Sequence, residues 1–219
     1  MLQTFKANLD EIRQKITKIG EDLVKSNELI LEALQSCDEK KFNEARNCIK
    51  NITSKTDEID NAIIKILALY TPEARDLRQV VAYFKITNEL SRACSNTRSF
   101  IRGFTDVCKD LDVKEINEYA ILMQTSTVKA IRTTIKMINV DDADELQEMY
   151  EEVLIEENKA DDLYEMIERK LVEQAEGSNT FEKYHKMLRA LRKSEKIANR
   201  AISVANLLVY VKLGGHIHN

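Results

Sequence analysis

The 219-residue chain has little of what breaks or bends a helix, since it contains one proline and five glycines. It also contains no tryptophan, and aromatic residues make up only 6% of it, which leaves little of the aromatic content typical of β-strands. Glutamate, lysine, leucine, isoleucine and alanine dominate instead. This balance is typical of a mostly helical protein.

Cysteines and long apolar runs are also scarce. The chain has four cysteines without CxxC spacing, namely Cys37, Cys48, Cys94 and Cys108. No secretory segment opens the chain, so we expect these to be reduced thiols in a cytoplasmic protein. The longest apolar stretches, around residues 62–70 and 204–211, are too short to span a bilayer. We therefore expect no membrane span.

No block of the chain carries charge of a single sign. The 33 basic and 37 acidic side chains give a net charge of −4 and no concentrated basic face, which disfavours nucleic acid as the main partner. The sequence contains no G-x-S-x-G, no Walker loop and no dinucleotide fingerprint. It offers no convincing catalytic nucleophile or base, so we expect a protein that is not an enzyme.

Apolar side chains recur every three or four residues along six stretches of the chain, which predicts six long amphipathic helices. The expected helices cover residues 5–36, 41–69, 73–101, 116–138, 146–171 and 188–208. Pro72 fits the first turn of the third helix, Gly103 closes that helix, and Gly177 breaks the chain before the sixth. Short connections make neighbouring helices antiparallel. We therefore predict an all-α fold of two tandem antiparallel three-helix bundles.

The second half of the chain repeats the plan of the first. A constant offset of 104 residues relates the two halves, as Glu195 and Ser91 illustrate (195 − 91 = 104). We therefore expect an internal duplication, with the first bundle at residues 1–105 and the second at residues 112–219.

Oxygen-bearing side chains interrupt two apolar seams of the second half. Glu157 with Asp161, and Glu195 with Asn199, are spaced four residues apart, so each pair lies on one helix face. Glu195 falls where the seam requires an apolar residue, and a buried unpaired carboxylate costs several kcal/mol. If the fifth and sixth helices face each other, the four side chains form a cluster that suits Mg, Ca, Mn, Fe or Zn.

Two other interpretations of these carboxylates remain open. Lys159, Lys193, Lys196 and Arg200 lie close in sequence, so the same pattern fits a helix surface covered with ion pairs. A carboxylate-bridged di-iron enzyme is a second alternative. Such sites use two Glu-x-x-His motifs, whereas this chain has one, Glu182 to His185.

Three segments of the sequence together resemble the PhoU family of phosphate-uptake regulators. Residues 9–20 are similar to the family's opening helix with its mid-helix glycine. Residues 72–78 look like its P-x-A-x-D-L-R signature, and residues 85–90 look like the helix that follows this signature. Residues 194–200 stand in the register of its E-R-I-G-D motif, and residues 209–214 match its usual ending.

The resemblance implies a metal site, because the family carries E(D)xxxD motifs that bind multinuclear metal clusters. Glu157, Asp161 and Glu195 match acids of these motifs, and Asn199 stands where the family has aspartate. The equivalent positions of the first half are Thr53, Asp57, Ser91 and Ser95. Since these retain at most one acid, we expect divalent, iron or zinc ions in the second repeat only.

The resemblance also implies a function. It predicts a cytoplasmic regulator of phosphate uptake and phosphate-responsive gene expression, which acts without catalysis. Its expected partners are the ATPase of a phosphate transporter, a sensor histidine kinase, or both. Peripheral association with membrane complexes and a homodimer are further expectations. An accessory protein of a different transporter or signalling partner is the alternative.

Overall fold

The computed structural model of the chain describes residues 2–105, 114–175 and 181–214. Seven helices account for nearly all of this part, and it contains no strand. They are α1 (Leu2–Ser36), α2 (Glu39–Cys48), α3 (Ile52–Tyr70), α4 (Ala74–Thr105), α5 (Lys114–Met137), α6 (Ala143–Ala175) and α7 (Phe181–Leu213). The all-α prediction is confirmed. The predicted break at Gly177 and the junction after residue 105 lie outside the described residues.

The helix predicted for residues 41–69 is interrupted. Asn51 adopts a left-handed conformation with φ of 60° and separates α2 from α3. Asparagine tolerates this conformation, which a continuous helix excludes. Ile49 and Ile52 on either side are both buried. The apolar pattern therefore continues across the break, which is why periodicity alone could not locate it.

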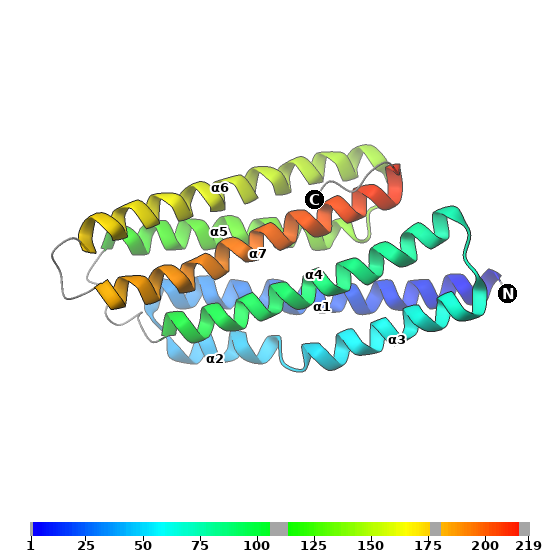
Figure 1. Cartoon of the computed structure of the whole chain (residues 1–219), viewed down its shortest axis with the longest axis horizontal. Coiled ribbons are helices and arrows are strands. Elements are labelled where there is room, and N and C mark those ends of the chain that lie inside the picture. Colours follow the sequence, from blue (N-terminus) through cyan, green and yellow to red (C-terminus); the bar gives the residue numbers. More distant parts are fainter. Residues whose placement is uncertain (1, 106–113, 176–180, 215–219) are drawn as a thin grey trace.

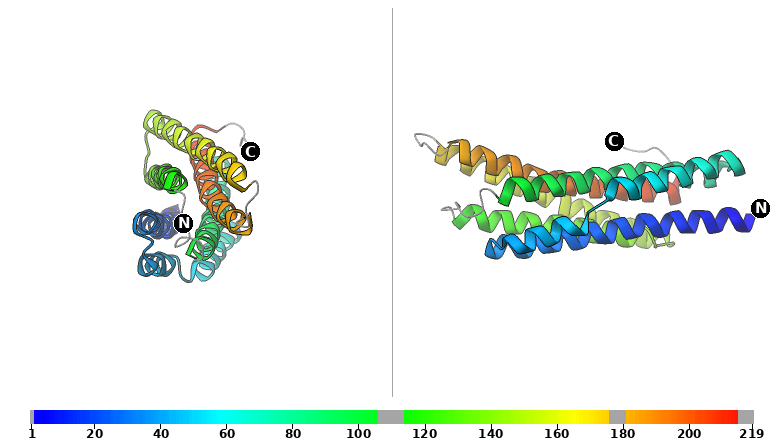
Figure 2. Two further views of the ribbon diagram at one scale, coloured as in Figure 1. Left: turned by 90° about the vertical axis from the view of Figure 1, so that its left-hand side faces the viewer. Right: turned by 90° about the horizontal axis from the view of Figure 1, so that it is seen from below.

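The helices form two antiparallel three-helix bundles that lie side by side (Figure 1). One consists of α1, α4 and the interrupted α2–α3 segment, and the other of α5, α6 and α7. Equivalent helices of the two bundles pack together, α1 against α5 and α4 against α7 (Figure 2). This arrangement confirms the predicted tandem three-helix bundles.

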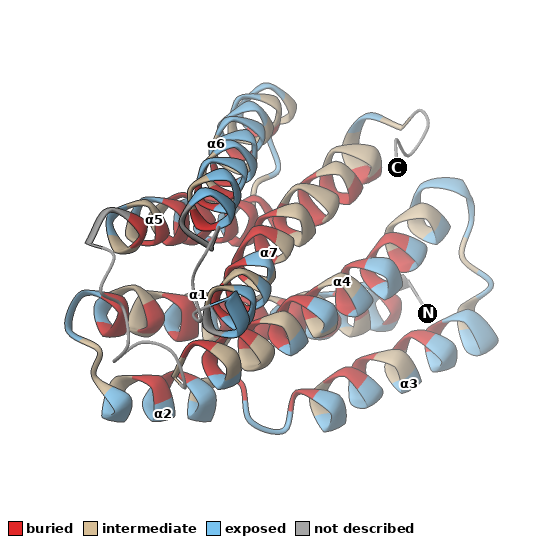
Figure 3. Cartoon of the chain, turned by 60° about the vertical axis from the view of Figure 1, so that its left-hand side comes forward, coloured by how far each residue is buried: buried red, intermediate tan, exposed pale blue. Residues whose placement is uncertain are grey.

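Each helix buries one stripe of apolar side chains and exposes the other faces (Figure 3). These stripes follow the expected offset of 104 residues. Buried residues of α1 and their equivalents in α5 are Ile12 with Ile116, Ile16 with Ala120, Ile19 with Met123, Leu23 with Thr127, and Ile30 with Thr134. In α4 and α7, Ile86 and Ala190 or Ala93 and Ile197 are likewise both buried.

The buried residues form two clusters, and each cluster draws on both bundles. One contains Ile16 of α1 and Ile135 of α5, and the other contains Phe100 of α4 and Leu191 of α7. The two bundles therefore share their cores rather than keeping one each. The division at residues 1–105 and 112–219 stays a prediction about the repeats.

A fully buried polar network crosses the middle of the molecule. Ser194 Oγ donates to Gln124 Oε1 at 2.7 Å, which joins α7 to α5. Gln124 Nε2 donates to Asn27 Oδ1 of α1 at 3.1 Å. Asn27 Nδ2 in turn donates to Thr97 Oγ1 of α4 at 3.3 Å. Since buried polar groups require partners, this network fixes the register of four helices from both repeats.

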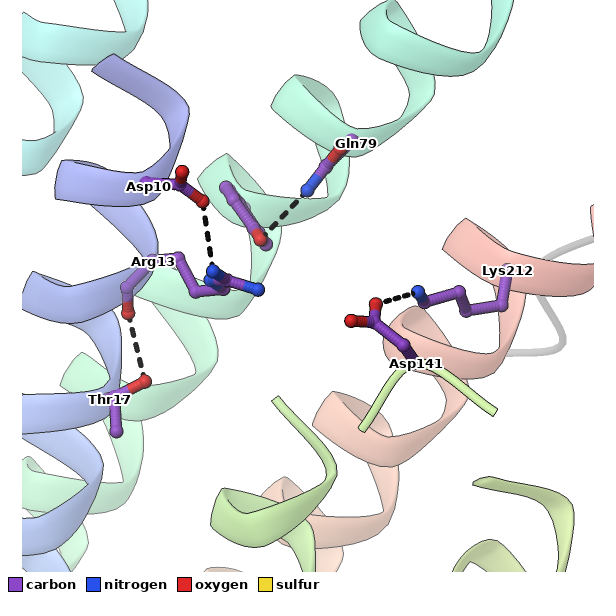
Figure 4. Close-up of polar contacts among 7 residues, drawn as sticks. Asp10, Arg13, Thr17, Gln79, Asp141 and Lys212 are labelled. Carbon is purple, nitrogen blue, oxygen red and sulfur yellow. Dashed lines mark hydrogen bonds and ion pairs between the residues drawn. The ribbon is translucent and has the colours of Figure 1, made fainter. Parts of the chain in front are cut away.

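Further polar contacts lie near the start of α1, the start of α4 and the end of α7 (Figure 4). Arg13 Nη2 donates to Asp10 Oδ1 at 2.9 Å on α1, and Gln79 Nε2 donates to Tyr83 Oη at 2.9 Å on α4. Lys212 of α7 forms an ion pair with Asp141, which precedes α6. These contacts join α7 to the start of α6 and order the surfaces of α1 and α4.

The cysteines differ from the expectation of four reduced thiols. Cys37 is disulfide-bonded, whereas Cys48 and Cys94 are free. Cys108 lies outside the described residues. The expectation is therefore wrong for Cys37, because the lack of CxxC spacing does not exclude a disulfide formed by residues that the fold brings together.

None of the helices in the described ranges is both long and apolar enough to cross a membrane.

Candidate functional site

Glu195 is buried in the middle of α7, where it is only 1% exposed. Asn199 Nδ2 donates to Glu195 Oε1 at 2.9 Å, and Lys196 Nζ donates to the same oxygen at 3.1 Å. Arg192 Nε lies 3.3 Å from Oε2 without making a hydrogen bond. The carboxylate is therefore paired with two cationic side chains from its own helix, as a buried charge requires.

Glu157 and Asp161 bring further negative charge toward this carboxylate from α6. Burial raises the pKa of Glu157, and the neighbouring charges of Asp161 and Glu195 raise it further, while Lys196 opposes the change. Asp161 itself is exposed. Of the four predicted site residues, Glu195 and Asn199 are in hydrogen-bond contact, and Glu157 lies close enough to Asp161 and Glu195 for their charges to raise its pKa.

The arrangement of this region fits a charge-compensated carboxylate rather than a metal centre. Lys196 and Asn199 donate to Glu195 Oε1. The ammonium and amide N–H groups therefore occupy the side of this oxygen on which a metal ion would bind. Within the described ranges, no group of three or more histidine, cysteine, aspartate or glutamate side chains could hold a metal ion. Buried Oε2 of Glu195 and Oδ1 of Asn199 do lack hydrogen-bond donors. Metal binding by these residues stays a prediction.

The equivalent positions of the first repeat lack the acidic character. Thr53, Asp57 and Ser95 are exposed and Ser91 is half-buried. Ser95 lines a hollow together with Arg46, Arg98 and Ser99. The surroundings of Ser95 are therefore basic, whereas the second repeat keeps three carboxylates in the corresponding region.

Sequence reasoning missed an ion pair that joins the two repeats next to Glu195. Arg200 Nη1 of α7 donates to Glu89 Oε2 of α4 at 2.8 Å, with both side chains largely buried. The sequence singled out Arg200 only as a possible partner of nearby acids. Glu89 lies 111 residues away, so no local spacing could have found the pair.

The segment at residues 72–78 contacts the end of α7. The Arg78 guanidinium lies over the Tyr210 ring, 5.5 Å from its centroid. Gly214 follows with φ of 75°, and a Cβ there would lie 2.7 Å from Arg78 Nη1. Two segments of the sequence resemblance therefore meet in space, and the left-handed φ of Gly214 explains why a glycine closes α7.

The lone Glu-x-x-His motif shows no sign of a metal site. Glu182 pairs with Lys186, and the His185 ring stacks on Phe181 at a centroid distance of 6.1 Å. The motif lies at the exposed start of α7. It therefore gives the di-iron alternative no support.

Comparisons with known proteins agree on one family and fold. Residues 16–100 match the model of the PhoU domain. No curated protein matches the chain in sequence. The fold is similar to the phosphate transport system regulatory protein PhoU from Streptococcus pneumoniae, with a TM-score of 0.84 and 16% identity over 98% of this chain and 99% of that one.

Two further solved structures share the fold. PhoU from Pseudomonas aeruginosa matches with a TM-score of 0.76 and 23% identity, over 96% of this chain and all of that one. A protein from Shewanella oneidensis MR-1 described as a PhoU-like phosphate regulatory protein matches with a TM-score of 0.65 and 13% identity, over 91% and 98%.

Proposed function

We propose that this chain, which belongs to the PhoU family through the domain at residues 16–100, regulates phosphate uptake and phosphate-responsive gene expression. It acts in the cytoplasm and without catalysis, by contact with a phosphate transporter's ATPase, with a sensor histidine kinase, or with both. The observation that carries the proposal is the match of residues 16–100 to the PhoU domain. The near-complete overlap with the PhoU fold from Streptococcus pneumoniae, a phosphate transport system regulatory protein, adds support.

An exposed apolar stripe on α4 is the surface that we assign to the partner. Leu77, Val81 and Phe84 are 41%, 39% and 46% exposed. Their spacing of four and three residues places them on one helix face. Large apolar side chains that gather on a surface mark sites of protein contact more often than isolated ones do. The stripe also begins within residues 72–78, the segment with the most specific family resemblance.

We commit to the transporter ATPase as the occupant of this stripe, because the relative with the same fold is a phosphate transport system regulator. The rigid body of long helices binds one state of the ATPase better than the other. Differential affinity of this kind shifts the equilibrium between the two states of the partner. The chain then associates with the membrane only through the transporter complex.

Affinity purification of the full chain from its own cells tests this assignment. The wild-type chain should bring down the phosphate-transporter ATPase, and Phe84→Glu should weaken that recovery because it places a charge in the apolar stripe. Leu122→Glu is the matched control, since Leu122 is 53% exposed on α5, outside the stripe. Equal loss with both variants, or recovery of another transporter alone, would refute the assignment.

A further inference from the structure

Two adjoining hollows are lined by residues of α2, the end of α4 and the start of α7, and α4 packs against both other helices. The first has a volume of about 430 Å³ and is lined by Arg46, Ser95, Arg98, Ser99 and Arg102. The second has a volume of about 420 Å³ and is lined by Ser99, Arg102, Gly103, Lys186, Arg189, Ala190 and Lys193. Ser99 and Arg102 line both hollows, so the two lie side by side.

Among the described residues, the linings contain six cationic side chains and no acidic one. In the described part of the chain, five of the six have no carboxylate within ion-pair distance, namely Arg46, Arg98, Arg102, Arg189 and Lys193. Lys186 pairs with Glu182. Elsewhere on the surface, cations such as Lys15 and Arg169 pair with an acid four residues earlier on the same helix. A group of cations without acids creates a local positive potential that attracts anions.

The other lining residues suit a phosphate group. The guanidinium group of arginine binds phosphate through two parallel N–H donors, and hydroxyl groups can donate to the remaining phosphate oxygens. The hydroxyls of Ser95 and Ser99 lie among the arginines. Gly103 and Ala190 are the two small residues of the second hollow, where α4 and α7 approach so closely that a Cβ on Gly103 would lie 3.2 Å from that of Ala190.

The repeat offset places hydroxyl side chains at two first-repeat positions, of which Ser95 lines the first hollow. Ser91 and Ser95 occupy the positions that Glu195 and Asn199 hold in the second repeat. Carboxylates at the first-repeat positions would repel an anion, whereas serine hydroxyls can donate to one. The Ser95 hydroxyl therefore adds a donor to the arginines of the first hollow, where no described lining residue would repel an anion.

We infer that the two adjoining hollows bind a linear oligophosphate, such as short polyphosphate or the triphosphate of a nucleotide. Each hollow falls within the range of about 300–1,000 Å³ for small-molecule sites, which exceeds the needs of a single phosphate ion. Six cations spread over three helices match an extended chain of negative groups. An oligophosphate in this position bridges α4 of the first repeat and α7 of the second, and it binds whether or not the chain regulates phosphate uptake.

Calorimetric titration of sodium tripolyphosphate into the full chain tests the inference. Arg102 lines both hollows, so Arg102→Gln should weaken binding by about tenfold or more through loss of a charge-assisted contact. Arg92→Gln is the matched control, because Arg92 lies on the same helix, pairs with Glu89 and lines neither hollow. Circular dichroism of both variants should show the same helical content as the wild type.

Parallel titrations separate the possible sources of the phosphate groups. Tripolyphosphate and ATP should both bind and compete with each other, and inorganic phosphate should bind much more weakly. Binding should also weaken as salt rises, since salt screens the contacts. No tripolyphosphate binding, equal affinity of the Arg92→Gln and Arg102→Gln variants, or binding only to phosphatidylglycerol vesicles would overturn the inference.

Discussion

Arg132 Nη2 of α5 donates to Glu28 Oε1 of α1 at 2.6 Å, and the two residues lie 104 positions apart. This is the offset that relates the two repeats, so residues at equivalent positions pair with each other. Such a contact requires equivalent helices to run side by side, as α1 and α5 do. The interface between the two bundles therefore pairs equivalent positions of the two repeats.

The first prediction concerns the close approach of α1 and α5 at Gly20. A Cβ on Gly20 would lie 2.3 Å from Ile135 Cδ1 and 2.8 Å from Cγ1. Isoleucine is stiff at χ1, so rotation relieves this clash poorly. Gly20→Ala should lower the free energy of unfolding by about 1–3 kcal/mol, despite the higher helix propensity of alanine.

Chemical denaturation of the double variant Gly20→Ala with Ile135→Ala supplies the control for that contact. Removing most of the Ile135 side chain makes room for the new methyl group, so the two changes should be strongly non-additive. If the losses in the free energy of unfolding were additive, contact with Ile135 would not be the reason that position 20 requires glycine.

The second prediction is a pH dependence caused by Glu157. Burial and the nearby acids raise its pKa above the ordinary value of 4.5, so the folded state binds the proton more tightly than the unfolded state does. Stability is therefore lost as pH rises from about 4.5 through the raised folded pKa. Glu157→Gln should raise the melting temperature at pH 7 relative to wild type, and the gain should shrink at pH 4.

Thermal melts of Glu157→Gln and Glu152→Gln at both pH values give the comparison. Glu152 is an exposed residue of the same helix, so its replacement should leave the melting temperature nearly unchanged. An equal response of the two variants would show that Glu157 is not destabilised by its surroundings.

The third prediction concerns Glu195. Glu195→Ala leaves the half-buried Lys196 and Asn199 without their shared acceptor, and it should cost about 1–3 kcal/mol in the free energy of unfolding. Urea denaturation measures this loss. The matched control is Glu165→Ala on the exposed face of α6, where the pair with Arg169 is worth little. A neutral Glu195→Ala would contradict the buried ion pairs described for this residue.

The fourth prediction addresses metal binding at Glu157, Asp161, Glu195 and Asn199. Any cation bound there competes with the Lys196 ammonium for Glu195 Oε1. The Lys196→Gln variant should therefore bind Zn²⁺ or Fe²⁺ more tightly than the wild type does. The control variant Lys159→Gln should not, because Lys159 pairs with Glu156 and not with Glu195. Metal analysis after equilibrium dialysis measures the difference. No metal in any variant would end the metal hypothesis.

The fifth prediction distinguishes the free thiols. Burial raises the pKa of Cys94 to about 12, and it also raises the pKa of the half-buried Cys48. Alkylation requires the thiolate and access to the sulfur. Iodoacetamide should label Cys48 slowly in native protein and leave Cys94 unlabelled until denaturant is added. Mass spectrometry that finds equal native labelling would contradict the burial of Cys94.

The helices could be predicted from the sequence because each one buries a single stripe with helical spacing. The break at Asn51 could not, because Ile49 and Ile52 are both buried on either side of it. The burial of Glu195 followed from its place in the seam of α7. Its pairing with Lys196 fits the ion-pair alternative, which spacing could not separate from a metal ligand.

The basic hollows were beyond prediction from one sequence. Their cations come from three helices that are far apart in the chain, and only the packing of α4 against α2 and α7 brings them together. The spacing of Arg98 and Arg102, or of Lys186, Arg189 and Lys193, offered a local signal. Charged residues at such spacings are common on exposed helix faces, so that signal could not identify a site.

Phosphate uptake in a deletion strain tests the central claim most directly. In phosphate-rich medium, cells that lack the gene should differ from wild-type cells in their uptake of labelled phosphate and in their transcription of phosphate-starvation genes. The reason is that the proposed regulator of the transporter is missing. The wild-type gene should restore normal values, and Phe84→Glu should fail to do so while Leu122→Glu succeeds. Unchanged uptake and unchanged transcription after deletion would contradict the proposed function.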